Sequence, residues 1–293
     1  MVGERGLKKA LIILLFLLPN LIGFLLFSLV PVVASLGLSL FKWDLLSAPV
    51  FVGLQNFRNL MKDVDFWAAT RHTFTFIIGY IPLVLAVGLG VALVLNQKLK
   101  GLAFYRTAFF LPVVSSWVAV ALIWKWLFNP NVGMVNYMLS LIGIHGPAWL
   151  FDEHWAMPAI ILASVWKDMG FVSVLYLSGL QGIADEYYEA ASLDGATPWE
   201  KFRHVTLPLI SPTTFFVLII SLINSFQVFE QVYVMTNGGP AGATNVLVQQ
   251  IYNNAFRYGR MGYASAMSWF LFALVFAATL IQMWGQRRWV HYE

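Results

Sequence analysis

Residues Ala10 to Phe41 read ALIILLFLLPNLIGFLLFSLVPVVASLGLSLF, and this stretch contains no Asp, Glu, Lys or Arg. A helix needs about 20 apolar residues to cross about 30 Å of hydrocarbon, and this run is longer than that. It is also too long for the core of a signal peptide and has no small-residue cleavage site. The chain is therefore expected to retain this stretch as a membrane span.

Five further stretches have the same character. Four carry no charged residue, at 72–97, 107–124, 205–229 and 261–286, and the stretch 155–180 carries only Lys167 and Asp168. Each is long enough to cross a bilayer as a helix. We therefore predict an all-α, polytopic membrane protein with six transmembrane helices in one domain over residues 1–293. The expected spans are about 11–40, 72–97, 107–128, 155–180, 207–234 and 262–286.

The composition agrees with a chain that mostly faces lipid. Hydrophobic residues make up 59% and charged residues 11% of the chain, and its mean hydropathy is +0.73. Soluble domains usually carry about 25% charged residues. A membrane β-barrel would show strands of about 10 residues with alternating polarity, and the sequence lacks that alternation. The absence of cysteine excludes disulfides, thiol catalysis and zinc–thiolate sites, but it does not indicate a compartment.

The distribution of basic residues predicts the orientation. One side of the expected membrane holds Arg5, Lys8, Lys9, Lys98, Lys100, Arg106, Lys201, Arg203, Arg287 and Arg288, which is more than half of the eighteen. The other side holds Lys42, Arg58, Lys62, Arg71, Arg257 and Arg260. The positive-inside rule then places both termini in the cytoplasm, as an even number of spans requires. These residues flank apolar spans and form no continuous patch, so a nucleic-acid partner is not expected.

The segment 182–208, which the predicted orientation places in the cytoplasm, gives the clearest indication of function. It reads GIADEYYEAASLDGATPWEKFRHVTLP. Its pattern predicts two short helices joined by a tight corner. Gly195 stands where a left-handed residue ends the first helix. The second helix is predicted to begin with Thr197 at its N-cap, Pro198 at its first position and Glu200 closing a capping box. Pro208 is expected to end or kink that helix.

This segment also has an apolar face, formed by Tyr187, Tyr188, Leu193, Trp199 and Phe202. A single cytoplasmic loop has no core in which to bury such a face, so the segment is expected to dock on a partner. Its sequence resembles the EAA motif of permeases from binding-protein-dependent ABC importers. The matching positions are Glu189, Ala190, Ala191, Gly195, Val205, Thr206, Leu207 and Pro208, with Val205 standing where the family usually has Ile.

The resemblance implies a type I ABC importer permease, whose coupling helix sits in a cleft of a cytoplasmic ATPase. On that basis Glu189, Ala190, Ala191, Gly195, Leu207 and Pro208 are expected to couple the chain to the ATPase. The stretches 51–57 (FVGLQNF), 236–240 (TNGGP) and 251–256 (IYNNAF) look like the carbohydrate-uptake branch, which includes maltose, disaccharide and glycerol-3-phosphate permeases.

The resemblance further implies a multi-subunit importer in a prokaryotic plasma (inner) membrane. Its other parts would be a homologous second permease, two ATPase copies, an extracytoplasmic solute-binding protein and a sugar or polyol substrate. No Gly-Lys dipeptide of a P-loop occurs in the chain. The chain is thus expected to be non-catalytic and without a cofactor, with ATP and Mg bound on the partner ATPase.

Charged residues interrupt the apolar spans at Lys125, at Lys167 with Asp168, and at Glu230. A charge at the bilayer centre costs at least about 2.5–3.5 kcal/mol and normally faces the bundle interior or a wet cavity. Lys125 lies near a span end and can reach the interface. In maltose-type permeases this part of spans four and five forms the substrate pocket. The candidate substrate-path residues are therefore Lys167, Asp168, Phe171, Ser221, Ser225, Gln227 and Glu230. A mutually neutralised structural pair at Lys167 and Asp168 is the alternative.

Two other functional classes compete with an importer permease. A secondary transporter driven by an ion gradient would show inverted repeats with paired broken helices, which the sequence does not clearly show. It would also leave the segment 182–208 without a role. A membrane enzyme would need clustered acid–base residues, but His72, His145, His154, His204 and His291 are scattered.

Overall fold

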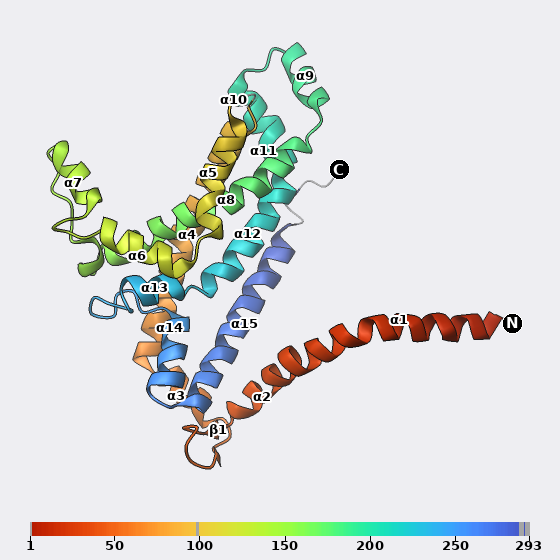
Figure 1. The fold of residues 1–293 in the computed structure, drawn as a ribbon, viewed down its shortest axis with the longest axis vertical. Coiled ribbons are helices and arrows are strands. Elements are labelled where there is room, and N and C mark those ends of the chain that lie inside the picture. The colour runs from red at the N-terminus through yellow and green to blue at the C-terminus, as the bar shows by residue number, and fades with distance from the viewer. Residues whose placement is uncertain (1, 98–99, 287–289, 291–293) are drawn as a thin grey trace. The chain divides into compact units, whose positions relative to one another are not determined.

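The computed structural model describes residues 2–97, 100–286 and 290, and the basic residues Lys98, Arg287 and Arg288 named above lie outside this range. The chain folds as two compact units, and Figure 1 labels their helices and strands. One unit consists of residues 1–63 and 251–270, and the other consists of residues 64–250 and 271–293.

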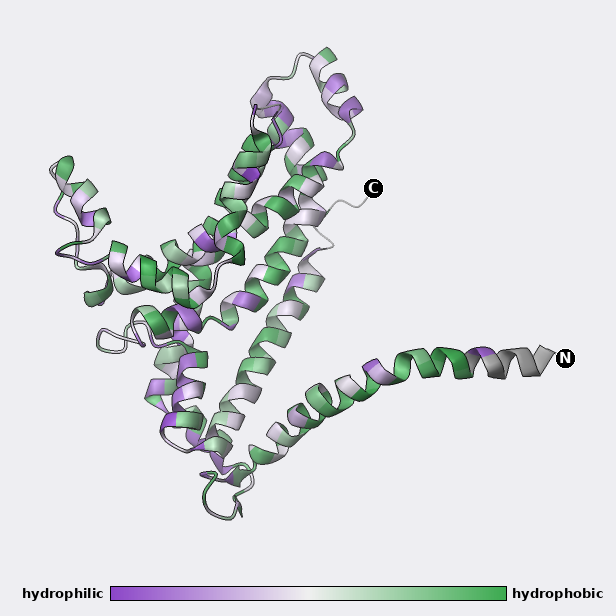
Figure 2. Ribbon diagram, viewed as in Figure 1, coloured by the Kyte–Doolittle hydropathy of each residue, from purple (hydrophilic) through white to green (hydrophobic). Residues whose placement is uncertain are grey.

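A long helical rod opens the first unit. It runs through α1 (Val2–Phe24), the π-helical turn η1 (Leu25–Leu29) and α2 (Val30–Leu38). The wide turn comes directly before Pro31, which has no N–H to donate to the preceding turn. Apolar side chains point outward along the rod, and Phe16 and Phe27 are more than 80% exposed. In Figure 2 much of the ribbon of this rod is green, the colour of hydrophobic residues. This apolar surface suits a helix surrounded by lipid.

A hairpin and three short helical segments complete the first unit. Strands β1 (Phe41–Lys42) and β2 (Val50–Phe51) are antiparallel, with Phe41 opposite Phe51. They are followed by α3 (Gln55–Lys62), the π-helical turn η4 (Asn253–Arg257) and the first turns of α15 (Met261–Gln286). Gly262 brings α15 against β1, since a β-carbon there would overlap the carbonyl of Phe41.

The second unit contains the remaining helices. They are α4 (Val64–Leu95), α5 (Leu102–Val114), α6 (Trp117–Leu127), α7 (Met134–Leu141), η2 (Trp149–Phe151), α8 (Ala156–Gln181), α9 (Asp185–Leu193), α10 (Pro198–Lys201), η3 (Phe202–Thr206), α11 (Leu207–Leu209), α12 (Ser211–Phe226) and α13 (Glu230–Met235). Helix α14 (Leu247–Tyr252) begins in this unit, and the last turns of α15 belong to it.

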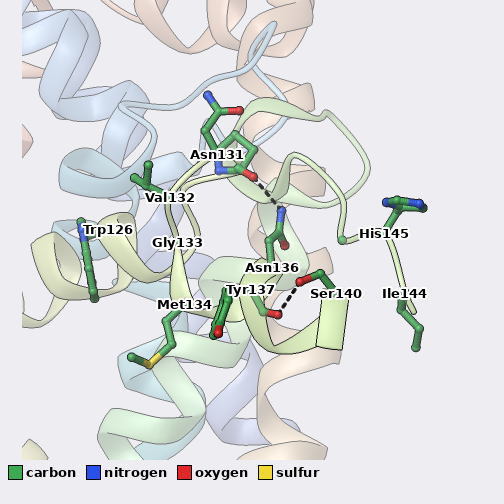
Figure 3. Close-up of a pocket in the computed structure, with 12 residues that line it drawn as sticks. Trp126, Asn131, Val132, Gly133, Met134, Asn136, Tyr137, Ser140, Ile144 and His145 are labelled. Atoms are coloured by element: carbon green, nitrogen blue, oxygen red, sulfur yellow. Dashed lines mark hydrogen bonds between the residues drawn. The ribbon is translucent and has the colours of Figure 1, made fainter. Parts of the chain in front are cut away.

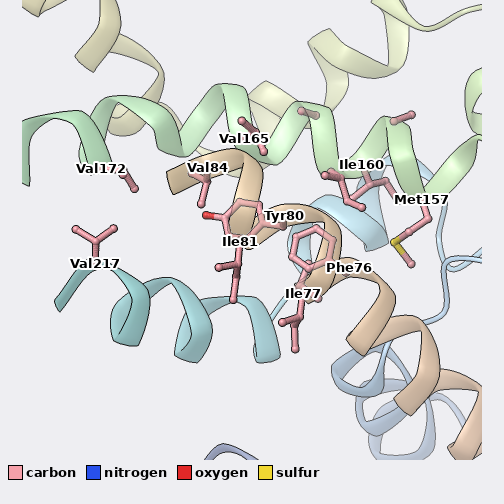
Figure 4. Close-up of a cluster of buried hydrophobic side chains, with 14 of the residues drawn as sticks. Phe76, Ile77, Tyr80, Ile81, Val84, Met157, Ile160, Val165, Val172 and Val217 are labelled. Atoms are coloured by element: carbon pink, nitrogen blue, oxygen red, sulfur yellow. The ribbon is translucent and has the colours of Figure 1, made fainter. Parts of the chain in front are cut away.

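The core of the second unit lies where α4, α8 and α12 meet (Figure 4). Buried side chains there include Phe76, Tyr80 and Val84 from α4, Ile160 from α8 and Val217 from α12. Glycines allow the helices to approach closely, as is common in membrane proteins. Gly88 on α4 lies against the Val172 side chain of α8, and Gly170 on α8 lies against the Phe109 carbonyl of α5. A β-carbon at either glycine would overlap these atoms.

The described residues hold four helices that are long and apolar enough to cross a bilayer, and six spans if each of two bent pairs counts as one. The expected span 107–128 is bent by 100° between α5 and α6. The expected span 207–234 is bent by 63° at Ile210, between the segments Pro198–Leu209 and Ser211–Phe226. It is interrupted again between α12 and α13. Pro112 precedes the first bend, and Pro208 and Pro212 lie on either side of the second.

Candidate functional site

The segment 182–208 adopts the helix–corner–helix conformation predicted from its sequence. Helix α9 ends at Leu193, and Gly195 follows with a φ of +77°. The amide of Ala196 donates to the carbonyl of Ala191 over 2.9 Å, which is the bond that closes a Schellman motif. The predicted left-handed Gly195 is therefore confirmed. A β-carbon there would meet no other atom within 4 Å, so the position requires glycine for its backbone conformation.

The second helix of the segment begins with the predicted capping box. Thr197 Oγ1 accepts from the Glu200 amide, and Glu200 Oε2 accepts from the Thr197 amide at 2.7 Å. Glu200 Oε2 also accepts from the Thr197 hydroxyl at 2.7 Å. The bond from the Thr197 amide, and after it the bond from the hydroxyl, lower the pKa of the Glu200 carboxyl below its ordinary value. Pro208 does not end the helix, since α11 continues through it to Leu209. The predicted kink is present, because the wide turn η3 precedes Pro208 and the chain bends by 63° directly after Leu209.

Two side-chain bonds hold the two halves of the corner together. Lys201 Nζ donates to Ser192 Oγ over 2.6 Å, and the hydroxyls of Tyr188 and Thr206 lie 3.0 Å apart. Much of the apolar face is exposed, with Leu193 89% and Trp199 65% exposed, while Tyr188 and Phe202 are half-buried. Helix α9 has no buried residue. The corner is thus a fixed, exposed apolar surface between the end of α8 and the start of α12 (Figure 1).

Most candidate coupling residues lie on this exposed surface. Glu189 and Ala190 are exposed, while Ala191 is half-buried against the closing bond of the corner. Leu207 is 39% exposed, and Pro208 is half-buried where the segment meets α12.

Lys167 lies at the break between α5 and α6. Its side chain is 6% exposed, and its Nζ donates to the carbonyl oxygen of Val113 over 3.2 Å. The last carbonyls of a helix have no partner within that helix, and the C-terminal end of a helix favours a positive charge. The ammonium also lies 5.1 Å from the ring centre of Trp117, the first residue of α6. Lys167 thereby supplies hydrogen bonding and charge at a bent point of the bundle.

Asp168 faces a different helix. Its Oδ2 accepts from the hydroxyl of Tyr80 on α4 over 2.8 Å. Because adjacent helical residues diverge by about 100°, Asp168 and Lys167 hydrogen-bond to opposite neighbours of α8. The two side chains therefore have separate hydrogen-bonding partners, on α4 and α5. Phe171, one turn further along α8, is 40% exposed.

The candidates on α12 and α13 divide into a packed and an exposed group. Ser221 and Ser225 are 4% and 2% exposed, and Ser225 Oγ donates to the Leu222 carbonyl of its own helix. Gln227 and Glu230 are exposed, on either side of the break between the two helices. The structure thus does not gather the seven substrate-path candidates into one pocket.

Two residues that the sequence analysis did not single out complete the intramembrane polar contacts. Tyr80 binds Asp168, and Trp117 lies beside Lys167. Tyr80 could have been noticed as a tyrosine within an apolar run, because a buried tyrosine hydroxyl normally finds a partner. That the Val113 carbonyl would be free to accept from Lys167 could not be predicted, since only Pro112 and the pair Ser115 and Ser116 mark a break in the helix there.

The loop between α6 and α8 forms a cavity of about 470 Å³ (Figure 3). Asn136 holds the loop closed: its Nδ2 donates to the carbonyls of Pro130 and Pro147, and its Oδ1 accepts from Trp149 Nε1 over 2.6 Å. Helix α7 beside the cavity exposes apolar side chains, including Tyr137 at 64% and Leu141 at 68%. The loop therefore presents a second exposed apolar surface.

Known proteins are similar to this chain in sequence and in fold. Residues 83–291 match the family described as binding-protein-dependent transport system inner membrane component. The probable ABC transporter permease protein YesP of Bacillus subtilis is 39% identical over 283 residues, which cover 95% of this chain and 91% of the relative. The trehalose/maltose transport system permease protein MalF of Thermococcus litoralis is 35% identical over 271 residues, covering 92% and 91%.

Two solved structures of ABC transporters have the same fold over nearly the whole chain. A chain of a bacterial ABC transporter that imports the acidic polysaccharide alginate matches with a TM-score of 0.85 and 28% identity, covering 98% of this chain and 99% of that one. A bacterial alginate transporter in complex with a periplasmic protein that holds an alginate pentasaccharide matches with a TM-score of 0.84 and 27% identity, covering 97% and 96%.

Proposed function

Because the chain belongs to the family of binding-protein-dependent transport system inner membrane components, we propose that it forms half of the translocation path of a sugar importer. The family is one of non-catalytic, multi-pass permeases of ABC importers, in which a separate subunit hydrolyses ATP. The proposal adds the substrate class, a sugar or related polyol, and the partner that completes the path, a homologous second permease. Residues 1–293 act in it as one permease domain.

The fixed corner at Gly195 is the observation that carries this proposal. A left-handed glycine, a capping box and two cross-bonds hold an apolar surface that the described chain leaves exposed. A surface held rigid before docking loses little conformational entropy on binding. We assign it to a cleft of a cytoplasmic ATPase, two copies of which would serve the two permeases. ATP and Mg would bind there, so the chain needs no cofactor of its own.

The opposite ends of the spans would meet the solute-binding protein. Successive loops of a polytopic chain alternate between the two sides of the membrane, so the loop carrying α7 lies opposite the segment 182–208. With that segment in the cytoplasm, both termini are cytoplasmic and α7 is external. Its exposed apolar side chains offer a contact surface for a binding protein.

A sugar as substrate is supported by the relatives and by the polar contacts inside the bundle. One relative is a trehalose/maltose permease, and the alginate importers carry a polysaccharide. Asp168 with Tyr80 and Lys167 with Trp117 combine polar groups with aromatic rings, as saccharide sites do. We propose that these contacts on α8, rather than the packed serines of α12, border the path. The ion-gradient-driven transporter weighed above is not supported by the relatives.

Purification of the complex from native membranes tests the proposal. An affinity tag on this chain should recover a second permease of similar sequence and an ATPase with a Walker A motif. The same preparation should hydrolyse ATP faster when a sugar-loaded binding protein is added. Recovery of the chain alone, with transport that follows an ion gradient and ignores ATP, would refute the proposal.

A further inference from the structure

A second cavity, of about 840 Å³, lies in the first compact unit. Its walls come from the β1–β2 hairpin, from α3 and from the start of α15. The sequence FVGLQNF at 51–57 contributes to it, and the permease function proposed above gives that stretch no role. Pockets for small molecules usually measure about 300–1,000 Å³, so this one has room for an oligosaccharide of a few rings.

The hairpin supplies a carboxylate and an aromatic ring in fixed positions. Asp44 Oδ1 accepts from the amides of Leu46 and Ser47 and from the Ser47 hydroxyl, at 2.7–3.0 Å. These bonds all use one oxygen, so Oδ2 remains as an acceptor. They lower the Asp44 pKa to about 2, which keeps the carboxyl ionised at neutral pH. Trp43 is held by a bond from its Nε1 to the Ser47 carbonyl at 2.9 Å.

Helix α3 supplies amides. Gln55 Nε2 donates to Asn59 Oδ1 over 2.8 Å, so within the described chain Gln55 Oε1 and Asn59 Nδ2 keep their capacity to accept and to donate. Asn56 between them has a different task. Its Nδ2 donates to the carbonyls of Ser39 and Phe41, at 2.8 and 2.9 Å, and so fixes α3 to the end of the preceding helix. Helix α3 therefore combines one anchoring asparagine, Asn56, with two further amides that line the cavity, Gln55 and Asn59.

The remaining wall balances the charge. Tyr263 of α15 donates from its hydroxyl to Asp63 Oδ2 over 2.5 Å. Arg260 and Lys42 also line the cavity, so its lining holds two carboxylates and two basic side chains. A cavity of zero net charge gives no long-range preference for an anion or a cation. Placed amides, carboxylates and aromatic rings without net charge suit a ligand with many hydroxyl groups.

We propose that this cavity binds a neutral oligosaccharide outside the membrane, as a receiving site distinct from the path beside Asp168. It lies at the ends of the expected spans 11–40 and 262–286, where Gly262 and Tyr263 from the first turn of α15 line it. By the alternation of loops it faces the side opposite the segment 182–208, from which the solute arrives. The inference rests on the proposed substrate class and on that topology, but not on the proposed intramembrane contacts.

Thiol protection in the assembled complex tests the site directly. The chain contains no cysteine, so Asn59→Cys adds a single thiol to it. The complex, with cysteine-free partners and no binding protein, is reconstituted in vesicles and treated with a maleimide in the presence of trehalose, lactose or maltotriose. Only empty cavities react, so a saccharide at about ten times its Kd slows labelling about tenfold. Leu46→Cys, at a residue that is 95% exposed and outside the cavity, should label at an unchanged rate.

Other arms separate the alternative explanations. Protection of Asn59→Cys by at least one neutral sugar, its weakening by Gln55→Ala, and weaker protection by an acidic alginate oligosaccharide support the proposal. No protection by any sugar, equal slowing at both positions, or protection only when binding protein is added overturns it. Uptake by the same vesicles is measured in parallel with binding protein present. Uptake without protection refutes this site alone, whereas a complex that transports no sugar refutes the proposed function. If Asn59→Cys prevents assembly, Gln55→Cys takes its place.

Discussion

Asp168 and Tyr80 form a polar contact between α8 and α4 within an apolar core. Tyr80 is 4% exposed, so a variant that removes the carboxylate leaves a buried hydroxyl without a partner. Such a loss costs about 1–3 kcal/mol, which a large assembled complex can tolerate. If the contact borders the sugar path, its chemistry matters more for transport than for folding.

We expect Asp168→Ala to lower sugar uptake or change sugar preference while the complex still assembles and retains basal ATPase activity. Tyr80→Phe removes the same bond but keeps the carboxylate, so it separates the effect of the charge from that of the bond. Competition between sugars for uptake into vesicles gives the readout. Failure of both variants to assemble would make the contact structural.

Ser225→Leu is expected to destabilise the folded chain by about 1–3 kcal/mol, because it adds volume at a 2% exposed position.

Gly195 allows a matched test of coupling. Its φ is +77°, and a side chain there costs about 1–2 kcal/mol of backbone strain and enters the surface that would dock. We expect Gly195→Asp to insert and assemble but to lose the ATPase stimulation by sugar-loaded binding protein. Gly101→Asp is the control, since Gly101 has a φ of +76° and equally open surroundings in another loop. Normal stimulation in Gly195→Asp, or equal loss in both variants, would contradict the assignment.

The break between α5 and α6 gives Lys167 its role among the helices. Lys167→Met keeps the length of the side chain but removes the donor to the Val113 carbonyl and the charge beside Trp117. Hydrogen bonds between membrane helices contribute about 0.6–2 kcal/mol, so the melting temperature of the solubilised complex should fall. Lys167→Arg keeps the charge and should lose less. An unchanged melting temperature in Lys167→Met would show that the contact does not stabilise the break.

Local patterns made some elements predictable from sequence and left others hidden. The corner at 194–200 depends on Gly195, Thr197 and Glu200 within a few residues of one another, so its caps could be predicted. The bend at Ile210 had a signal in Pro208, but the size of the 100° bend between α5 and α6 had none, because an apolar run reads the same in a straight and in a broken helix. The partners of Lys167 and Asp168 depend on how α8 packs against α5 and α4, and that information lies far away in the sequence.

The orientation of the whole chain follows from the same reasoning and can be tested with single cysteines. Ser192 and Ala148 are both exposed, and they lie in loops that the span order places on opposite sides. Ser192→Cys should react with a membrane-impermeant thiol reagent only after the cytoplasmic side is opened. Ala148→Cys should react in cells or spheroplasts whose inner membrane is intact. The reverse pattern would turn the topology over and remove the coupling assignment with it.

At the scale of the complex, the central claim is that this chain carries sugar at the expense of ATP hydrolysed on a partner. The most direct measurement is uptake of radiolabelled sugar into vesicles that hold the purified complex, with binding protein outside and ATP inside. We predict uptake that requires both, stops with a non-hydrolysable ATP analogue and persists when ionophores dissipate all ion gradients. Uptake that continues without ATP and ends with the ionophores would contradict the account.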